Sequence, residues 1–475
     1  MIFHSLSYLV FFTAVFVLYW ALRRRAAQNW FLLAASLAFY GWVEPWWLIL
    51  ILLTCVIDFN AARLVVDRPE HRKRWLALSL VTNFSILAVY KYFNFFSASF
   101  SSVVEKLTGH EAHPFLLQVM LPAGISFYTF QSASYVVDVY RRQMEVRRSL
   151  SEYILFVSFF PHLVAGPIQR AHFLLSQIEM PRVFDARVAR SAVVLVLWGF
   201  FKKLVIADNA AMVVGKVFTL DNPSFPVLWG GVFAFGVQIF ADFSAYTDIA
   251  RGCSRLLGFE LCRNFDHPYL AESPQDFWRR WHISLSNWFR DYVYIPLGGS
   301  RCRLAMQCRN VMLTFLLSGL WHGAAWNYVM WGAWHGALLV VWMLWSKAPE
   351  AFRPERMPKV LRVALTFILI HIGWLMFREQ SVPHLWKHFT LNPFAADAAQ
   401  WRMGWFFVAQ TLLYAFPLYL HPLLDRWLAR RTEAVEAHYP GWRWTVGLAA
   451  LGLVLYFGII LLRSPASSDF IYFQF

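Results

Sequence analysis

The sequence is poor in charged residues. Asp, Glu, Lys and Arg supply only 15% of its 475 residues, whereas a soluble domain carries about 25%. Hydrophobic residues supply 59%, and the mean hydropathy is +0.45. This composition excludes an ordinary water-soluble enzyme. It predicts an all-α, polytopic integral membrane protein, since helices are the usual way to satisfy the backbone inside a bilayer.

Cysteine is also scarce, and its number is odd. Four of the five cysteines fall in or near basic segments that we expect on the cytoplasmic side, where disulfides rarely persist. We therefore expect free thiols, with neither a disulfide nor a zinc or other metal site. The five are Cys55, Cys253, Cys262, Cys302 and Cys308.

Acidic residues are outnumbered by basic ones, 28 to 43, which gives a formal net charge of +15. Such an excess can indicate nucleic-acid binding. Here, however, the basic residues gather in short segments between apolar runs, as in residues 23–25, 251–309 and 426–443. This is the positive-inside pattern of membrane proteins. It predicts contact with membrane lipid and no nucleic acid, and it places both chain termini on the extracytoplasmic side.

Apolar runs long enough to cross a bilayer begin with residues 6–22 and end with residues 444–462. The first lacks the basic start and the cleavage site of a signal peptide, so we expect it to remain a membrane helix. We expect ten to twelve transmembrane helices. Residues 153–168 and 311–345 contain or adjoin Gly and Pro, which predicts re-entrant or broken segments. No repeat or linker divides the chain, so a single transmembrane domain over residues 1–475 is expected.

Histidines within apolar surroundings are candidates for chemistry, because ionisable groups are costly there. His322 and His335 each stand between a tryptophan and a glycine. Glycine permits close backbone approach, and tryptophan supplies a flat wall for a narrow pocket. The alternative is a structural histidine that hydrogen-bonds between helices, and the pattern favours this alternative for His335.

Residues 277–291 combine aromatic positions at helical spacing with arginines. They indicate an interfacial or re-entrant helix. Its arginines either snorkel to the membrane surface or form a basic mouth for a phosphate-bearing donor such as a coenzyme A thioester, with His282 facing inwards. The substrate-binding candidates are Trp278, Arg279, Arg280, Trp281, Arg290, Trp321 and His335.

Two further segments carry polar groups. Asp242 and Asp248 end an apolar run, but a separation of six residues does not place them on one helix face. We expect them to stabilise the basic region rather than to catalyse. The aromatic C-terminus, residues 470–475, either anchors at the membrane interface or presents the hydroxyl of Tyr472 as an acyl acceptor.

Taken together, these segments resemble the membrane-bound O-acyltransferase family, and within it the alginate O-acetylase branch of bacterial polysaccharide acetyltransferases. The resemblance spans nearly the whole chain. The matching strings are residues 124–131, 163–168, 238–300, 321–323, 334–336 and 470–475.

The resemblance implies a helical fold around a central funnel. In it, His322 matches the essential active-site histidine, His282 a second recurrent histidine, and Tyr472 an acyl relay. It also implies acetyl-CoA as the cytoplasmic donor, with no permanently bound cofactor. The implied location is the bacterial inner membrane. The implied partners are a periplasmic SGNH or serine hydrolase-like acetyltransferase and a polysaccharide synthesis and secretion complex.

The expected function is therefore transfer of acetyl across the membrane for O-acetylation of an exopolysaccharide, alginate or cellulose. His322 would act either as a general base or as a nucleophile that forms an acetyl-imidazole. Peptidoglycan O-acetylation and teichoic-acid D-alanylation are alternatives within the same chemistry. A transporter or flippase is the alternative from another class, but it typically shows repeated halves, which this sequence does not.

Overall fold

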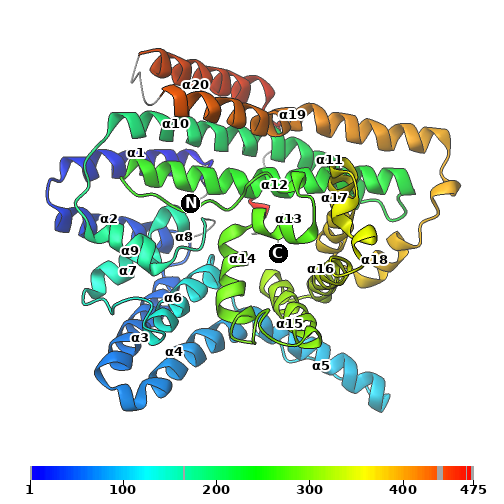
Figure 1. The fold of residues 1–475 in the computed structure, drawn as a ribbon. Helices are drawn as coiled ribbons and strands as arrows, with labels where there is room; N and C mark the ends of the chain where they lie inside the picture. Colours follow the sequence, from blue (N-terminus) through cyan, green and yellow to red (C-terminus); the bar gives the residue numbers. More distant parts are fainter. Residues whose placement is uncertain (1–2, 164–165, 436–441, 467, 472–475) are drawn as a thin grey trace. The chain divides into compact units, whose positions relative to one another are not determined.

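The computed structural model describes residues 3–163, 166–435, 442–466 and 468–471. These residues form helices and connecting segments without a strand (Figure 1). The predicted all-α fold is confirmed. The chain divides into two compact units, Met1–Ala186 with Cys253–Cys262 and Arg187–Gly252 with Arg263–Phe475.

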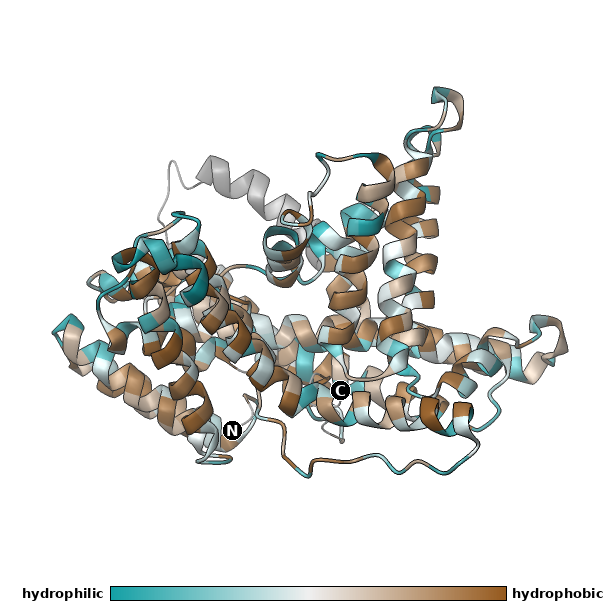
Figure 2. Cartoon of the chain, turned by 90° about the horizontal axis from the view of Figure 1, so that it is seen from below, coloured by the Kyte–Doolittle hydropathy of each residue, from teal (hydrophilic) through white to brown (hydrophobic). Residues whose placement is uncertain are grey.

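Six helical stretches of the described residues are long and apolar enough to cross a membrane, and two shorter helices are also apolar. The chain is a multi-pass membrane protein. Figure 2 shows apolar residues along most of the helices. The expected ten to twelve crossings stay a prediction. The six are Trp47–Asp67, Pro69–Thr108, Phe225–Leu256, Trp326–Trp345, Lys359–Arg378 and Ala398–Leu420, and the shorter two are Leu6–Ala21 and Val446–Leu462.

The first unit contains the N-terminal helices. Its α3 packs against α4 and α6. The buried carboxylate of Asp58 on α3 accepts hydrogen bonds from Ser79 (2.6 Å), Asn83 (2.8 Å) and Ser132. The elements are α1 Leu6–Ala21, α2 Arg25–Gly41, α3 Trp47–Asp67, η1 Pro69–His71, α4 Arg72–Leu87, η2 Ala88–Tyr92, α5 Phe93–Thr108, α6 Ile125–Tyr140, α7 Leu150–Ser158, α8 Phe160–Leu163 and α9 Ala171–Glu179.

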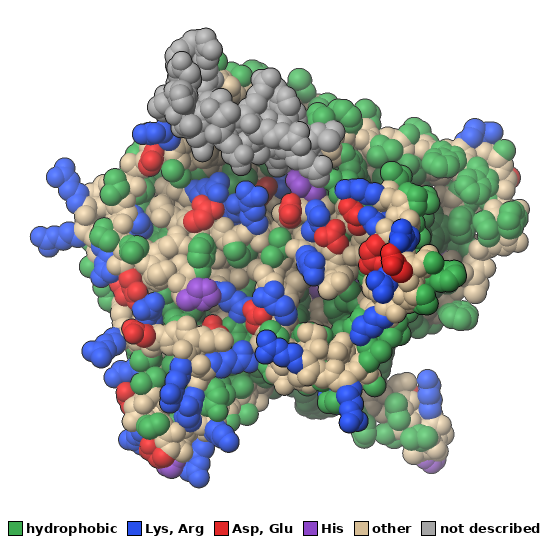
Figure 3. Space-filling view, viewed as in Figure 1, with side chains coloured by type: hydrophobic (Ala, Val, Ile, Leu, Met, Phe, Trp, Pro, Cys, Tyr) green, Lys and Arg blue, Asp and Glu red, His purple; other side chains and the backbone are tan. Residues whose placement is uncertain are grey.

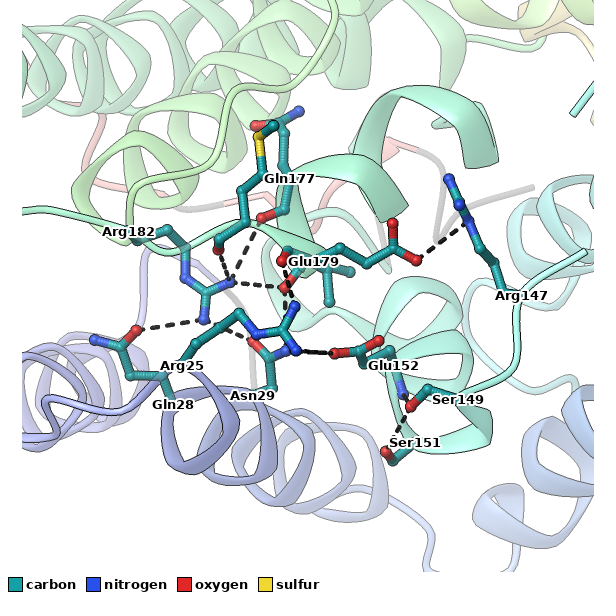
Figure 4. A network of polar contacts seen from close by, with 12 residues as sticks. Arg25, Gln28, Asn29, Arg147, Ser149, Ser151, Glu152, Gln177, Glu179 and Arg182 are labelled. Atoms are coloured by element: carbon teal, nitrogen blue, oxygen red, sulfur yellow. Dashed lines mark hydrogen bonds and ion pairs between the residues drawn. The ribbon is translucent and has the colours of Figure 1, made fainter. Parts of the chain in front are cut away.

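A polar network fastens distant segments of this unit to one another (Figure 4). The guanidinium of Arg182 donates to Asn29 on α2 at 2.6 Å. Arg25 forms an ion pair with Glu152 on α7 at 3.6 Å. The polar groups of this network thus bind one another, which indicates that the network has a structural role.

The predicted break within residues 153–168 is confirmed. Helix α7 ends at Ser158, and the short α8 covers Phe160–Leu163.

The second unit is built on two long helical stretches. The first joins α10 Ala186–Phe201, the π-helical turn η3 Lys202–Ala207 and α11 Asp208–Phe218. The second is α12 Phe225–Leu256, which lies against α10 (Figure 1). A Cβ atom at Gly199 would lie 2.6 Å from a side-chain carbon of Ile249. The two helices therefore approach as closely as small residues permit.

After α12 the chain folds into two short helices, α13 Pro274–Arg280 and α14 Ile283–Phe289. The expected continuous helix over residues 277–291 is therefore wrong. His282 interrupts it with a left-handed backbone, φ +43°. Asn264 stabilises the break, because its backbone oxygen accepts from Ile283 N at 2.9 Å and its side-chain oxygen accepts from Ser284 N at 3.2 Å.

Helices α15 Leu304–His322 and α16 Trp326–Trp345 form a hairpin. Its packing depends on glycine. A Cβ at Gly319 would lie 2.2 Å from the oxygen of Tyr328, and one at Gly332 would lie 2.3 Å from the oxygen of Phe315. The predicted break within residues 311–345 is thus the three-residue connection of this hairpin.

Further contacts between helices complete the second unit. Helix α13 packs against α16 and α17, and α11 packs against α19. All five cysteines of the chain are free thiols. The remaining elements are η4 Pro268–Leu270, η5 Arg290–Tyr294, η6 Glu350–Phe352, η7 Pro354–Arg356, α17 Lys359–Arg378, α18 Val382–Phe389, η8 Pro393–Ala395, α19 Ala398–Val435 and α20 Trp442–Leu462.

Candidate functional site

The three histidines singled out from the sequence lie in one aromatic cluster of the second unit. The ring centroid of His282 is 6.0 Å from that of Trp321. Trp321 lies 5.0 Å from His322, and the His322 ring is 4.9 Å from Trp331. We name these residues, together with His335, the histidine cluster.

Trp331 links His322 to His335. Its ring centroid is 4.8 Å from that of His335, which is buried and also lies 5.1 Å from Trp278. The sequence reasoning did not single out Trp331. Its position four residues before His335, one helical turn away, was a signal that could have found it.

A cavity of about 560 Å³ lies between α13, α14, η5, α15 and α16. Its volume falls in the range of small-molecule sites, roughly 300–1,000 Å³. Arg279, Arg290 and Lys347 line it, and no acidic side chain is among the described residues that do so. Figure 3 shows Lys and Arg side chains over the region of α13 and α14. We name it the α13–α16 cavity.

This cavity ends one helical turn from His322. Ser318 lines it, and His322 follows four residues later as the last residue of α15. Four residues of an α-helix rise about 6 Å. Trp278 also lines the cavity while it contacts His335. A ligand in the cavity would therefore be close to the histidine cluster.

Only some of the other predicted binding residues line the α13–α16 cavity. Trp278, Arg279 and Arg290 line the cavity. Arg280 does not, because its guanidinium pairs with Asp276 at 2.8 Å. Trp281 is buried, with its ring centroid 4.8 Å from that of Trp374.

The imidazole of His282 is held in an apolar environment. It is fully buried, with Phe243 at 4.7 Å between ring centroids. Burial lowers the pKa of His282 to about 3, because the charged ring would lose its hydration. At physiological pH the ring is therefore neutral, and a neutral imidazole has one nitrogen that donates a proton and one that accepts it.

A buried ion cluster includes Asp242, the residue that precedes Phe243 on α12. Lys203 Nζ is 2.9 Å from a carboxylate oxygen of Asp208 and 3.0 Å from one of Asp242, and all three side chains are almost fully buried. Lys203 and Asp208 were missed from the sequence. Adjacent lysines within an apolar run were a signal that could have found Lys203, because a buried cation requires a partner.

The two acids of α12 have different partners, as expected from a spacing that does not share a helix face. Asp242 pairs with Lys203, and Asp248 pairs with Lys202 at 2.7 Å and with Arg251 at 3.4 Å. The expectation that both stabilise the basic region is therefore wrong for Asp242. Its partner lies on η3, which precedes it by 39 residues.

The ion cluster also holds the C-terminal tail. Lys203 donates to the backbone oxygen of Ser468 at 2.7 Å, and the Ser468 hydroxyl donates to Asp208 at 2.6 Å. The backbone N–H of Ile471 donates to Asp242 at 2.7 Å. The last described residues of the tail are thus fixed by charge-assisted hydrogen bonds.

The ring of Phe470 anchors the tail in the interior. It is fully buried and stacks on Tyr246 at 3.9 Å between centroids. It also lies 6.1 Å from Phe243, the ring that contacts His282. Tyr472, Phe473 and Phe475 lie outside the described residues.

These observations describe a candidate functional site. Buried imidazoles lie between a cavity lined by cations and the last described residues of the C-terminal tail. In the described part of the chain, no three His, Cys, Asp or Glu side chains are grouped closely enough to hold a metal ion.

Comparison with known proteins agrees with this description. Residues 142–379, which include all three histidines, match the sequence profile of the MBOAT, membrane-bound O-acyltransferase family. A probable alginate O-acetylase of Pseudomonas aeruginosa is 38% identical over 82% of this chain and 74% of its own length. One from Pseudomonas putida is 35% identical over 100% of both. A peptidoglycan O-acetyltransferase of Helicobacter pylori is 31% identical over 94% of this chain and 91% of its own length.

Proposed function

Because this chain belongs to the membrane-bound O-acyltransferase family and is an O-acyltransferase, we propose that it moves an acetyl group from cytoplasmic acetyl-CoA across the bacterial inner membrane. The acetyl group serves the O-acetylation of an exopolysaccharide, alginate or cellulose. A periplasmic SGNH or serine hydrolase-like acetyltransferase, associated with the polysaccharide synthesis and secretion complex, completes the delivery.

The α13–α16 cavity is the observation that carries this proposal. Arg279, Arg290 and Lys347 supply cations for the phosphates of coenzyme A. Ser318 leads from the cavity to His322, one helical turn further along α15. The thioester end of the donor therefore reaches the histidine cluster while its phosphates stay among the basic residues. This donor needs no flipping across the bilayer.

The acceptor is the chain's own tail. The hydroxyl oxygen of Tyr472 attacks the acetyl carbonyl, a carbon–oxygen bond forms, and the carbon–sulfur bond to coenzyme A breaks. A nitrogen of His322 takes the hydroxyl proton and returns it to the departing thiolate. In the alternative sequence, His322 first takes the acetyl group itself and Tyr472 then attacks the acetyl-imidazole. Trp331 and His335 position the His322 ring in both sequences.

The bonds at Ser468 and Ile471 support this role of the tail. They fix the backbone immediately before Tyr472, and the adjacent Phe470 is stacked within the interior. A reactant that is already positioned avoids much of the entropic cost of a bimolecular reaction.

Peptidoglycan is the second candidate acceptor polymer. The Helicobacter pylori relative, named a peptidoglycan O-acetyltransferase, is 31% identical over 94% of this chain. The relatives named probable alginate O-acetylases reach 38% identity, which favours alginate.

A substitution that fills the cavity tests the donor route. Ser318→Leu adds three carbons at the end of the α13–α16 cavity nearest His322. We expect it to lower acetyl-CoA consumption by the purified chain at least about tenfold, because a displaced thioester loses its reactive geometry. The matched control is Leu317→Phe, at an exposed position of the same helix turn.

Both variants are first compared with the wild type in thermal unfolding. If Ser318→Leu folds like the wild type and consumes acetyl-CoA at the same rate, the cavity is not the donor site.

A further inference from the structure

A second, smaller cavity of about 80 Å³ lies in the second unit, separate from the α13–α16 cavity. We name it the Lys202 cavity. Its walls come from α10, η3, α12, α19 and the segment that follows α12. The lining residues are Trp198, Lys202, Phe240, Ser244, Thr247, Asp248, Arg251, Arg263, Asn264, Phe265, His267 and Leu418.

The residues that line this cavity carry a net positive charge. Lys202, Arg251 and Arg263 are cations, and Asp248 is the one acid among the described residues of the wall. Lys202 and Arg251 both pair with that acid, at 2.7 and 3.4 Å. Three cations against one acid give the described residues of the wall their net positive charge.

Two buried polar groups of the wall have no hydrogen-bond partner in the part of the protein that the structure describes. The hydroxyl of Thr247, 1% exposed, has no hydrogen-bond partner among the described residues. The side-chain NH₂ of Asn264, which is fully buried, has none either. A buried donor without an acceptor destabilises the folded state, because it has lost its hydrogen bonds to water. Groups in this state are expected where a ligand or ordered water supplies the missing acceptor.

The donors converge because of helical spacing. Ser244, Thr247, Asp248 and Arg251 recur at intervals of three and four residues, so they share one face of α12. Lys202 reaches this face from the π-helical turn η3 and donates to Ser244 at 2.9 Å. Such turns often occur at functional sites.

The size of the cavity limits what it can bind. A volume of about 80 Å³ admits a few water molecules, each needing roughly 10–15 Å³ of such space. One phosphate group fits, whereas a nucleotide base does not. Leu418 of the wall belongs to the candidate membrane span Ala398–Leu420, so the cavity adjoins a helix that is expected in the bilayer.

We propose that the Lys202 cavity binds the phosphate group of an anionic ligand, supplied by a phospholipid headgroup or by a soluble phosphate. Arg263, Arg251 and Lys202 supply the charge, and Thr247 and Asn264 supply neutral donors. The ligand satisfies the two unpaired groups and the excess charge at once. This site does not depend on the proposed acyl transfer.

The site also touches the catalytic segment. The side-chain oxygen of Asn264 accepts from the hydroxyl of Ser284 at 2.6 Å, two residues after His282, while the same residue lines the Lys202 cavity. A bound phosphate therefore orients the carboxamide that supports the turn at His282.

Native mass spectrometry of the full-length protein tests the proposal, with phosphatidylglycerol and phosphatidylcholine as competing lipids. A parallel arm measures thermal unfolding in phosphatidylcholine nanodiscs with added inorganic phosphate. Three variants are compared with the wild type. Arg263→Gln removes an exposed cation of the cavity, and Thr247→Val removes the unpaired hydroxyl at nearly constant shape. Arg190→Gln removes the same charge from an exposed position of α10, outside the cavity.

We expect the wild type to retain phosphatidylglycerol over phosphatidylcholine, with about tenfold weaker retention in Arg263→Gln and a smaller loss in Thr247→Val. Arg190→Gln should match the wild type. If the two lipids bind alike but inorganic phosphate raises the unfolding temperature of the wild type and not of Arg263→Gln, the ligand is a soluble phosphate.

The proposal is overturned if neither probe distinguishes the wild type from Arg263→Gln, or if Arg190→Gln weakens binding equally. Should Arg263→Gln fail to fold, Thr247→Val decides between the same outcomes.

Discussion

The two sides of the histidine cluster are built differently. Towards α13–α16 the protein leaves a cavity of about 560 Å³, with no acid among the described residues of its wall. Arg279 and Lys347 line it, and so does Arg290, which pairs with the neighbouring Asp291 at 2.7 Å. Towards the C-terminal tail the charged groups are paired within the protein. There Lys203 has two acids and the backbone of Ser468 as partners.

This difference matches the chemistry of the two proposed reactants, a soluble donor and the tail of the chain. A soluble donor has to enter and leave, so its site needs space and charges left for its phosphates. A reactant that belongs to the chain remains in place, so buried ion pairs can hold it without an exchange route. Substitutions on the cavity side should therefore change the affinity for the donor. Substitutions on the tail side should change the stability of the protein and the rate of acetyl transfer.

The largest effect is expected where the two sides meet. His322→Ala should reduce polymer acetylation by about 10²–10⁴-fold, the usual contribution of a general base. Membrane insertion should remain intact, because one interior polar side chain is removed and no charge is added. Acetyl content of the polymer from cells that express the variant provides the measurement. Wild-type acetylation would remove His322 from the chemistry.

The second prediction removes the cation that holds the tail side, Lys203. Lys203→Met leaves Asp208 and Asp242 buried without a cation, and breaking such a pair costs about 3–5 kcal/mol. We expect a large drop in the midpoint of thermal unfolding, together with loss of acetyl transfer because the tail loses its anchor.

The neighbouring lysine is the matched control for that variant. Lys202→Met leaves Asp248, which is partly exposed and keeps Arg251 as a partner. Its unfolding midpoint should fall less. Equal losses in the two variants would contradict the assignment of the tail anchor to the ion cluster of Lys203.

On the cavity side we expect a smaller effect, confined to the affinity for acetyl-CoA. Arg279→Gln should raise the KM for acetyl-CoA about tenfold with little change in kcat, because contacts to remote phosphates bind the ground and transition states alike. Arg280→Gln should leave KM almost unchanged, since Arg280 pairs with Asp276 and does not line the cavity. Steady-state kinetics of both variants separate these outcomes. A larger KM change in Arg280→Gln would reverse the assignment.

Much of the fold could be predicted from the sequence, because the bilayer restricts the choices. Apolar runs of helical length gave the multi-pass all-α architecture, and glycine and proline marked the breaks near residues 158 and 323. The break at His282 was not predictable in this way. It depends on hydrogen bonds that Asn264, a tertiary partner, accepts from the backbone of residues 283 and 284, and on a left-handed backbone at a residue other than glycine.

The site was predictable where it follows local motifs. The ordered set of motifs, in which the long block of residues 238–300 precedes those around His322 and His335, identified the family, which the comparisons confirm. Two features depend on long-range contacts and were missed. Lys203 lies 265 residues before the Ser468 that it holds, and adjacent arginines at 279 and 280 point to different neighbours. The spacing of residues along the sequence does not reveal either of these contacts.

The location of the acetyl group on the protein tests the account most directly. The purified chain is incubated with isotopically labelled acetyl-CoA, and its C-terminal peptide is then analysed by mass spectrometry. The account predicts labelled acetyl on Tyr472 in the wild type. It predicts no label on this peptide in Tyr472→Phe, which keeps the ring but lacks the hydroxyl, or in His322→Ala. An unlabelled C-terminal peptide in a wild type that acetylates its polymer, or full polymer acetylation by Tyr472→Phe, would contradict it.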